Sequence, residues 1–467
     1  MHKVTSALGR HLALVGFMGA GKSTLGREVA TRLGREFVDL DEEIGRRIGK
    51  IDEFFLRHGE AAFRNVEATT AEVELARPPA VIALGGGAPT TDAVRELLAS
   101  CFVVHVDVDV DTAWRRVRGG DRPLAQDEAT FRRLYDERAP LYREVADAVV
   151  PSGDVDGVIL AAGGVHHELG ALDRLDELVP GDGPVALVAD QRVLGIHGPR
   201  AQNALGRRLV QTIDVPAGEE AKQLDVLRRL WSQLKLDRTG TIVALGGGTT
   251  TDLAGFAAAT YLRGIPWVSV PTTLVGQVDA AIGGKTAIDI PQGKNLVGAF
   301  HWPARVVIDE GLLDTLPERE YRQGRAELVK TELLAGRGLD IRGAAAYKTA
   351  LCLRDPHDRG PRNVLNLGHT FAHALEAAAD FDLPHGEAVA LGLLAALRLS
   401  GRDTKDVERE LRPKRVNVDP ERAWQALLRD KKVVGDAINI VVLTDNGPEV
   451  KRRSPGEVRR ELERLIA

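Results

Sequence analysis

The sequence predicts an α/β protein in which two sheet-containing parts precede a helical C-terminal part. Residues 11–34 read as a short apolar strand, a glycine-rich loop and a helix, in that order. The same order returns at 241–260, where an apolar strand runs into three glycines and an alanine-rich helix. After about residue 310 the pattern turns helical. Alternating strands and helices favour parallel sheets covered by helices.

The length and charge of the chain limit the classes of protein to which it can belong. A chain of 467 residues is too long to fold around one compact core, so two or three domains are expected. The net charge of −5 argues against a nucleic-acid binder, which needs a dense cationic face. Two distant cysteines, Cys101 and Cys352, are too few for a disulfide framework. The sequence shows neither a signal-peptide pattern nor an apolar run of membrane-spanning length, so we expect a cytoplasmic protein without membrane contact.

The first glycine loop, GFMGAGKST, has the full length and the context of a P-loop. Because Gly16, Gly19 and Gly21 have no Cβ, backbone N–H groups can turn inward around phosphate oxygens. The N-terminus of the following helix adds partial positive charge. Lys22 can reach the β- and γ-phosphates, and the Ser23 hydroxyl can ligate Mg²⁺. This stretch therefore predicts a nucleotide-phosphate site.

Later segments suggest what receives the phosphate. In FVDLDEEI, Asp39 and Asp41 lie two residues apart and would face one side of a strand, although a solvated acidic strand end is the simpler interpretation. In GEAAFRNVE, Arg64 and Glu67 share a helix face. VIALGGGAP is an apolar strand with a glycine turn that suits close approach of a small ligand. RGGDRPLA (118–125) has the composition of a phosphate-covering lid. Together these three further segments favour a site that binds the phosphate acceptor.

Residues 10–165 resemble the shikimate kinases. The matching phrases, in the family's order, are GFMGAGKST, DLDEEI, GEAAFR..E, ALGGG, RPL and RAPLY. The resemblance implies a P-loop kinase that uses ATP and Mg²⁺ to phosphorylate shikimate. It assigns the ATP phosphates to Gly19, Ala20, Gly21, Lys22, Ser23 and Thr24, the adenine to Arg116, and Mg²⁺ to Ser23 and Asp39. It assigns shikimate to Asp41, Arg64, Gly86, Gly87 and Arg138.

The roles that this resemblance implies agree with the chemistry of the residues. Asp41 would accept the ring hydroxyls and polarise the attacking one. Lys22, and Arg122 on the lid, would hold the ATP phosphates and stabilise the transferring phosphoryl group. The forked guanidinium groups of Arg64 and Arg138 match a planar carboxylate. The lid itself is slightly shorter than is usual in the family.

The second part of the chain starts with the layout of a dinucleotide fold. TIVALGGGTTTDLAGF joins a strand, three glycines and a helix, but it lacks a GxGxxG pattern, so a plain tight turn is an equal interpretation. Lys285 and Lys294 lie in the glycine-containing turns GGK and GKN. Clustered loop lysines of this kind suit an anionic substrate.

Five residues in the helical part have the spacing of a catalytic metal site. Glu327 and Lys330 lie three residues apart, His369 and His373 lie four apart, and His385 follows a proline turn. One carboxylate with two or three histidines on neighbouring helices matches a Zn²⁺ site with an open position. A single histidine of this kind is more often structural, but the set as a whole favours the metal site.

Residues 166–467 resemble 3-dehydroquinate synthase. The matching phrases include GEEAK, GGGTTTDLAGF, VDAAIGGK, GKNLVGAF, AELVK, LNLGHTFAHALE, HGEAVALG and RDKK. The resemblance implies binding of Zn²⁺ or Co²⁺ by Glu327, His369 and His385. It assigns NAD to Glu219, Lys222, Gly247, Gly248, Asp252, Thr272, Thr273, Lys285 and Lys294. It assigns the substrate pocket to Arg263, Asp279, Asn295, Lys348, Arg362, Asn366 and one of Lys431 and Lys432, with Lys285, Lys330 and His373 as catalytic groups.

The synthase family converts 3-deoxy-D-arabino-heptulosonate 7-phosphate to 3-dehydroquinate. The resemblance implies that NAD⁺ takes a hydride from a ring carbon, that the new ketone allows phosphate to leave, and that the hydride is then returned. The ring then opens and closes as a carbocycle. The metal would ligate two substrate hydroxyls and lower the pKa of the one being oxidised. Lysines and arginines would neutralise the carboxylate and the departing phosphate.

The synthase-like part departs from its family at three places. VDAA stands where VDSS is usual, so Ala280 and Ala281 lack two hydroxyls. Asp289 stands where asparagine is usual. The segment between Glu327 and Lys348 is shorter than usual, as if a helix had been deleted between two site residues.

We expect three domains: a P-loop kinase at 1–165, an NAD-binding lobe at 166–310 and an all-helical metal-binding lobe at 311–467. The pentapeptide ALGGG occurs in both halves, at 83–87 and 244–248, but the motifs around the two copies differ. Convergence therefore explains the repeated sequence better than an internal duplication does. The expected partners are small molecules, and the one protein assembly that we expect is a homodimer through the synthase domain.

The sequence leaves three other interpretations open. The second part could be a metal- and NAD-dependent polyol dehydrogenase on the same fold, although the lysine-rich turns and RAELVK favour the synthase. It could be a ligand-sensing module without turnover, which the shortened segment suggests and the intact set of one glutamate and two histidines opposes. The kinase could act on another hydroxylated acid such as gluconate, which the Arg64/Arg138 pair and DLD make less fitting.

Overall fold

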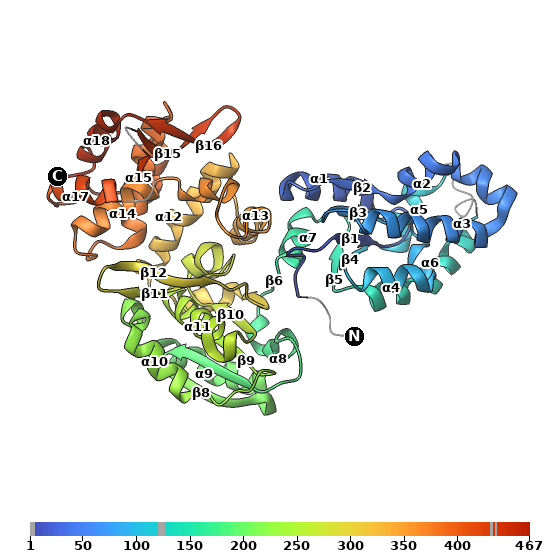
Figure 1. Cartoon of the computed structure of the whole chain (residues 1–467), viewed down its shortest axis with the longest axis horizontal. Helices are drawn as coiled ribbons and strands as arrows, with labels where there is room; N and C mark the ends of the chain where they lie inside the picture. Colours follow the sequence, from blue (N-terminus) through green and yellow to red (C-terminus); the bar gives the residue numbers. More distant parts are fainter. Residues whose placement is uncertain (1–4, 120–126, 430–432, 435–436) are drawn as a thin grey trace. The chain divides into compact units, whose positions relative to one another are not determined.

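A computed structural model describes residues 5–119, 127–429, 433–434 and 437–467. The chain separates into two compact units, Met1–Val165 and His166–Ala467. Figure 1 follows the helices and strands of each unit along the sequence. Among the described residues, no helix combines the length and the apolar character needed to cross a membrane.

The first unit is built on a five-stranded parallel sheet with the order β2-β3-β1-β4-β5. Its strands are β1 (Leu12–Val15), β2 (Phe37–Asp39), β3 (Val81–Ala83), β4 (Phe102–Asp107) and β5 (Ala148–Pro151). All of β1 is buried, as expected of a central strand in a parallel sheet. The strand order changes direction next to β1, so ligands are expected beyond the carboxyl ends of the central strands.

Aspartates cap four of the helices described in this unit. The helices are α1 (Lys22–Leu33), α2 (Leu40–Ile48), α3 (Ile51–Leu75), α4 (Asp92–Leu98), α5 (Val110–Val117), α6 (Glu128–Val145) and α7 (Val155–Ala162). Asp109, Asp127 and Asp154 each accept a hydrogen bond from a backbone N–H in the first turn of α5, α6 and α7. α3 bends at Gly59, whose φ of 80° lies outside the helical range.

The expectation that Asp39 and Asp41 share a strand face is wrong. β2 ends at Asp39, and Asp41 lies in the first turn of α2. Asp39 is the N-cap of α2 and accepts a hydrogen bond from the N–H of Asp41 at 3.1 Å. The preference of aspartate for the N-cap therefore outweighs the strand pattern at this point.

The second unit contains a six-stranded sheet with the order β6-β13-β10-β9-β7-β8. Its strands are β6 (Val165–His167), β7 (Val185–Asp190), β8 (Leu209–Val215), β9 (Thr241–Gly246), β10 (Trp267–Pro271) and β13 (Arg305–Ile308). The helices of this part are α8 (Leu175–Leu178), α9 (Gln191–Leu205), α10 (Leu224–Gln233) and α11 (Gly248–Thr260). β7, β9 and β10 are buried along their whole length, which explains their continuous apolar sequences.

The C-terminal part is mainly helical, as predicted, but it is not all-helical. It follows the antiparallel hairpin of β11 (Lys285–Ile290) and β12 (Gly293–Phe300) and contains α12 (Glu318–Ala335), α13 (Ile341–Arg354), α14 (His369–Ala378), α15 (His385–Leu399), α16 (Lys405–Leu411), α17 (Pro420–Arg429) and α18 (Pro455–Glu463). The structure adds a small antiparallel sheet of β14 (Val433–Val434), β15 (Ala437–Thr444) and β16 (Gly447–Arg453). Ile438, Ile440 and Val442 of β15 are buried in the same core as α14 and α15, so this sheet completes the helical core.

Glycines bring α12, α14 and α15 close together. A Cβ on Gly392 of α15 would lie 2.1 Å from the carbonyl oxygen of Gly368, the N-cap of α14. A Cβ on Gly386 would lie 2.5 Å from the Cα of Gln323 on α12, and the N–H of Gly386 donates to the Gln323 side chain at 2.6 Å. Backbone contacts this close need glycine, and they place the start of α14 against α15 and the start of α15 against α12.

We expect Gly392→Ala to destabilise the second unit by about 1–3 kcal/mol, because the added methyl group overpacks the contact with Gly368. Gly195→Ala on α9 is the matched control, since a Cβ there meets no other atom within 4 Å and alanine favours a helix. Urea unfolding followed by circular dichroism measures both variants. A Gly392→Ala protein as stable as the parent would contradict the close backbone contact.

Candidate active sites

The P-loop of the first unit depends on its glycines. Gly16, Gly19 and Gly21 have φ values of 148°, 82° and 80°, which residues with a side chain rarely adopt. A Cβ on Gly16 would lie 2.5 Å from the carbonyl oxygen of Val106, and one on Gly19 would lie 2.8 Å from that of Ala113. α1 begins directly after the loop, so the loop and the helix N-terminus together form an anion-binding end.

Lys22, Ser23 and Asp39 meet at this end. Nζ of Lys22 donates to the carbonyl oxygens of Gly16 at 2.8 Å and Phe17 at 3.2 Å. The Ser23 hydroxyl donates to Oδ2 of Asp39 at 2.5 Å. A hydroxyl and a carboxylate side by side can supply oxygen ligands to Mg²⁺, which usually takes only one or two side chains and completes its shell with water and phosphate.

Arg116 also lies against the P-loop. Its Nη1 donates to the carbonyl oxygen of Gly19 at 2.9 Å and to the Ser152 hydroxyl at 2.8 Å. Ser152 in turn donates to the carbonyl oxygen of Ala20 at 2.8 Å. The sequence reasoning missed Ser152, because a single serine after β5 has no distinguishing pattern. Arg122 lies outside the described residues, so its expected role has no structural counterpart.

The first ALGGG turn brings together the groups expected to hold the phosphate acceptor. A Cβ on Gly85 would lie 2.7 Å from Oδ1 of Asp41. A Cβ on Gly87 would lie 2.2 Å from Nη2 of Arg64. Both charged side chains therefore rest directly on the backbone of this turn, and a side chain at either glycine would displace them.

Glu67 fixes the orientation of Arg64. Oε2 of Glu67 accepts a hydrogen bond from Nη1 of Arg64 at 2.7 Å, and Glu60 accepts one from Nη2 at 3.0 Å. Glu67 is only 1% exposed. Burial raises the pKa of this carboxyl, although the charge of Arg64 opposes the rise. The pair sits on one face of α3, so its i,i+3 spacing in the sequence was a usable signal.

Tyr142 connects Arg138 with the glycine turn. Its hydroxyl donates to the carbonyl oxygen of Gly86 at 2.5 Å. Burial raises the pKa of Tyr142, and the nearby Arg138 guanidinium, itself buried, opposes that rise. Tyr142 follows Arg138 by one turn of α6, so helix spacing could have identified it as a partner.

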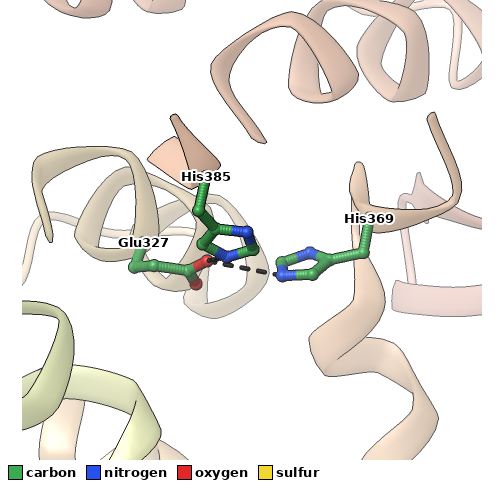
Figure 2. A group of neighbouring side chains, drawn as sticks. All are labelled: Glu327, His369 and His385. Carbon is green, nitrogen blue, oxygen red and sulfur yellow. Dashed lines mark hydrogen bonds and ion pairs between the residues drawn. The ribbon is translucent and has the colours of Figure 1, made fainter. Parts of the chain in front are cut away.

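Glu327, His369 and His385 converge in the second unit, as Figure 2 shows. They lie on α12, at the first residue of α14 and at the first residue of α15. Oε1 of Glu327 lies 3.3 Å from Nε2 of His369 and 3.1 Å from Nε2 of His385. The three ligand atoms fall within 4.8 Å of one another. One carboxylate oxygen and two imidazole nitrogens at this spacing suit a metal ion with open coordination positions.

The other ring nitrogen of each histidine is already engaged. Nδ1 of His385 lies 3.2 Å from Oε1 of Glu376, and Nδ1 of His369 lies 3.2 Å from the carbonyl oxygen of Leu367. Contacts of this kind fix the ring orientation and leave Nε2 for a metal. The sequence reasoning missed Glu376, although its spacing of seven residues from His369 places both on one face of α14.

A run of buried ion pairs continues from this cluster. Lys330 pairs with Glu327 and lies 3.4 Å from Oδ1 of Asp279. Lys348 lies 2.9 Å from the same oxygen of Asp279. Burial alone would raise the pKa of Asp279, but the two lysines lower it to about 2. Burial likewise opposes the charge on Lys330, but the two carboxylates prevail and raise its pKa. Asp279 and Lys330 therefore stay charged in the interior.

The two histidines differ in charge. Burial lowers the pKa of His369 to about 4, so its ring is neutral near pH 7. Burial also opposes a charge on His385, but its contacts with Glu327 and Glu376 raise its pKa to about 10. The carboxylates thus favour a positive charge at this place, and a metal ion competes with a proton for the same nitrogen.

The second ALGGG turn joins β9 to α11. Nζ of Lys222 donates to Oδ2 of Asp252 at 2.7 Å and also to the side chain of Asn295. A Cβ on Gly247 would lie 3.2 Å from Cγ2 of Thr273, which follows β10. These groups gather beyond the carboxyl ends of two parallel strands, where open α/β sheets bind ligands. Thr272 and Gly248 belong to the same two turns.

Other residues expected in the second site make contacts nearby. Lys285 pairs with Asp358. Nη1 of Arg362 donates to the carbonyl oxygen of Gly283 at 3.1 Å. Nζ of Lys294 lies 3.6 Å from Oε1 of Glu219.

Three expected residues lie closer to the surface. The rings of His373 and His369 have centroids 5.5 Å apart, and His373 is exposed. Arg263 is exposed in the turn Tyr261–Arg263. Asn366 is half-buried and its amide donates to the carbonyl oxygen of Asn363 at 3.2 Å. Lys431 and Lys432 lie outside the described residues.

Family models match three stretches of the chain. They are shikimate kinase at 18–160, 3-dehydroquinate synthase N-terminal at 212–323 and 3-dehydroquinate synthase C-terminal at 331–433. A bifunctional shikimate kinase/3-dehydroquinate synthase from Thermotoga maritima is 30% identical over 460 residues, which cover 90% of this chain and 93% of the relative. The chain belongs to the bifunctional shikimate kinase/3-dehydroquinate synthases.

The synthase part also matches proteins with a single function. A 3-dehydroquinate synthase from Symbiobacterium thermophilum is 41% identical over 352 residues, which cover 66% of this chain and 97% of the relative. The solved structure of 2-epi-5-epi-valiolone synthase from Streptomyces hygroscopicus subsp. jinggangensis, which contains NAD⁺ and Zn²⁺, is 25% identical with a TM-score of 0.54. That match covers 64% of this chain and 96% of the solved chain.

The two activities predicted from the sequence are confirmed. As a bifunctional shikimate kinase/3-dehydroquinate synthase, the chain is an enzyme of the shikimate pathway that combines a phosphotransferase and a lyase. None of these findings favours a polyol dehydrogenase, a sensor without turnover or a gluconate kinase.

We expect Glu376→Gln to weaken divalent-metal binding by the synthase about 10–100-fold, because an amide orients the His385 ring less firmly than a carboxylate does. Competition with a chromogenic chelator measures the affinity without turnover. Glu387→Gln, an exposed glutamate in the first turn of α15, is the matched control and should bind the metal as the parent does. Unchanged affinity in Glu376→Gln would show that His385 is not oriented through Glu376.

Proposed function

We propose that the two activities reside in separate domains. The kinase, at 1–165, phosphorylates shikimate with ATP and Mg²⁺. The synthase, with an NAD-binding lobe at 166–310 and a metal-binding lobe at 311–467, forms 3-dehydroquinate and phosphate from 3-deoxy-D-arabino-heptulosonate 7-phosphate. The convergence of Glu327, His369 and His385 from three helices is the observation that carries the synthase part of this proposal most directly.

In the kinase, the P-loop N–H groups hold the ATP phosphates. Lys22 leaves the loop carbonyls and turns to the β- and γ-phosphates, where a cation offsets the charge of the transferring group. Ser23 and Asp39, already joined by a hydrogen bond, supply the Mg²⁺ ligands. Arg116 lies beside the adenine from its position against Gly19.

Arg64 and Arg138 bind the shikimate carboxylate as forked donors. The contact of Arg64 with Glu67, and that of Arg138 with Tyr142, hold both guanidinium groups in place before the substrate arrives. Asp41, beside the glycine turn, accepts the ring hydroxyl and polarises it for attack. The N–H groups of Gly86 and Gly87 complete the contacts with shikimate.

In the synthase, Glu327, His369 and His385 hold Zn²⁺ or Co²⁺. The donor set supports this assignment, since both Nε2 atoms face the carboxylate and both Nδ1 atoms are bonded elsewhere. A bound metal lowers the pKa of the substrate hydroxyls that it ligates. His373, whose ring lies beside that of His369, is placed to exchange a proton with the substrate.

The second glycine turn holds NAD. Lys222 is already linked to Asp252 there, so these two polar groups are held in fixed positions for the cofactor, and Lys222 also contacts Asn295 of the substrate pocket. The complete proposed set is Glu219, Lys222, Gly247, Gly248, Asp252, Thr272, Thr273, Lys285 and Lys294. Support comes from the related 2-epi-5-epi-valiolone synthase, whose solved structure contains NAD⁺.

Cationic side chains neutralise the carboxylate and phosphate of the substrate. The proposed pocket comprises Arg263, Asp279, Lys285, Lys294, Asn295, Lys330, Lys348, Arg362 and Asn366. Asp289, unusual at its position, accepts a hydrogen bond from the N–H of Asn295 at 2.8 Å and so shapes the turn that presents this residue.

The shortened segment between Glu327 and Lys348 leaves the two buried lysines together. α12 and α13 are joined by residues 336–340 alone. Lys330 and Lys348 nevertheless contact the same oxygen of Asp279. This shared contact supports a working synthase pocket in spite of the shorter connection.

A homodimer through the synthase completes the proposal. Leu296, Val297 and Phe300 of β12 are exposed by 54%, 38% and 49%. Leu296 and Phe300 lie four residues apart and therefore share one face of the strand, and exposed apolar side chains on one face are typical of a surface that another chain covers. Analytical ultracentrifugation of the full chain would reveal a monomer if this assembly does not form.

We expect His369→Ala to reduce phosphate release from the heptulosonate phosphate more than about 100-fold, because one of three metal ligands is lost. Shikimate-dependent ADP formation should stay at the parent rate in the same protein. Coupled phosphate and ADP assays on one preparation measure both activities.

Lys22→Ala should have the opposite effect, with ADP formation reduced more than about 100-fold through loss of the phosphate-binding cation and phosphate release unchanged. Loss of both activities in either folded variant would contradict independent sites. Phosphate release that persists after chelation and removal of NAD would contradict the proposed synthase chemistry.

A further inference from the structure

A half-exposed aromatic ring lies beside the second site. Phe381, in the loop between α14 and α15, is 45% exposed and precedes the proposed metal ligand His385 by four residues. Nζ of Lys294, the second residue of β12, lies 4.6 Å from the centre of its ring. This cation–π contact therefore joins the loop that leads to a metal ligand with the hairpin that carries a lysine of the set proposed for NAD.

The backbone of this loop has an uncommon conformation. Asp380 and Phe381 have φ values of 52° and 65°, which residues with a side chain rarely adopt. The N–H of Phe381 donates to the carbonyl oxygen of Glu376 at 2.8 Å, and the carboxylate of Asp380 pairs with both Nη atoms of Arg422 on α17. Strained backbone persists only where surrounding contacts hold it, and it concentrates at functional sites. The loop thus presents the Phe381 ring from a fixed backbone.

Lys294 is anchored from the side of the NAD-binding lobe. Its Nζ lies 3.6 Å from Oε1 of Glu219, another residue of the set proposed for NAD. The next residue, Asn295, accepts a hydrogen bond from Nζ of Lys222. These contacts hold the start of β12 against the NAD-binding lobe, while Phe381 meets the lysine from the metal-binding lobe. The Lys294 ammonium therefore lies where the two lobes of the synthase meet.

The two partners of Lys294 act differently on its charge. A carboxylate such as Glu219 neutralises the ammonium and competes with an anionic ligand for it. The face of an aromatic ring attracts the cation through its quadrupole but carries no net charge. The side chain of Glu219 is 53% exposed, so solvent weakens its pairing with Lys294. A negatively charged ligand can replace Glu219 while the ammonium stays over the Phe381 ring.

We propose that Phe381 is a positioning residue for NAD binding, an inference that rests on the proposed role of Lys294 in the NAD site. The ring holds the Lys294 ammonium at the cofactor site with its charge intact. The pyrophosphate of NAD then replaces Glu219 as the anionic partner of the lysine. An aliphatic side chain in place of Phe381 leaves the lysine free to turn into solvent.

Titration calorimetry of the full chain with NAD⁺ tests this role. We expect Phe381→Leu to weaken NAD binding about three- to tenfold, because the aromatic face is lost. Leucine is unbranched at Cβ like phenylalanine, so the strained loop is kept. Phe381→Tyr keeps the aromatic face and should bind NAD as the parent does. Affinity equal to that of the parent in Phe381→Leu, or equal weakening in Phe381→Tyr, would overturn the proposal.

Tyr321→Leu is the matched control. Tyr321 is an aromatic residue of α12 that is 36% exposed, and its ring makes no cation–π contact among the described residues. This variant should bind NAD as the parent does. Weakening as large as that of Phe381→Leu would show that loss of any surface ring has this effect, and the assignment would fall.

A double-mutant cycle tests whether Phe381 acts through Lys294. Lys294→Met should weaken NAD binding by itself, and Phe381→Leu should add less than about twofold in that background, because both substitutions remove the same contact. Fully additive effects would refute the positioning role. If Lys294→Met binds NAD as the parent does, the proposed NAD role of Lys294 fails and the inference fails with it. An effect of Lys294→Met without one of Phe381→Leu removes only the inference.

Metal affinity separates this role from simple support of the loop. Zn²⁺ binding by Phe381→Leu, measured by competition with a chromogenic chelator, should equal that of the parent. A loss of Zn²⁺ affinity as large as the loss of NAD affinity would show that the ring holds the loop before His385 rather than Lys294, which would contradict the proposal.

Discussion

The buried carboxylate of Glu327 is the constraint on which the synthase half of the molecule depends. A fully buried charge is costly unless it is paired, and Glu327 is 0% exposed. Lys330 and the two histidines supply that pairing, and Lys330 then shares Asp279 with Lys348. These groups come from α12, α13, α14, α15 and the turn after β10. The pairing of the Glu327 carboxylate therefore fixes five elements around the cluster that it forms with His369 and His385.

Glycine serves both halves of the molecule by permitting close approach of backbone. In the kinase, Gly85 and Gly87 allow Asp41 and Arg64 to rest on the turn after β3. In the synthase, Gly368 and Gly392 let the backbones of α14 and α15 come into contact. These two helices carry His369 and His385 at their first residues. The two ALGGG turns lead into different structures, a 3-10 turn at Ala88–Thr90 and the long helix α11. Their different surroundings agree with independent origins of the two turns.

Motifs confined to one loop or one helix could be predicted well from the sequence. The P-loop is local, and so are the spacings of Glu327 with Lys330 and of Arg64 with Glu67. Contacts between distant segments could not be predicted, because no spacing rule relates them. Ser152 against Arg116, or Lys222 with Asn295, are examples. The N-cap role of Asp39 was missed for another reason: the same letters fit a strand end and a helix start, and the hydrogen bond to the N–H of Asp41 decides between them.

The sequence by itself determined the two activities and the order of the α/β and helical parts, since these reside in contiguous motifs whose residue types match their chemistry. Only the tertiary structure decided which charged side chains pair with one another. It brought Lys330 and Lys348 to one oxygen of Asp279 across the connection of residues 336–340, and it set Glu376 behind His385. The reason is physical, because a buried charge is costly unless an opposite charge or a hydrogen-bonding group lies beside it. Packing decides which group that is, wherever it lies in the chain.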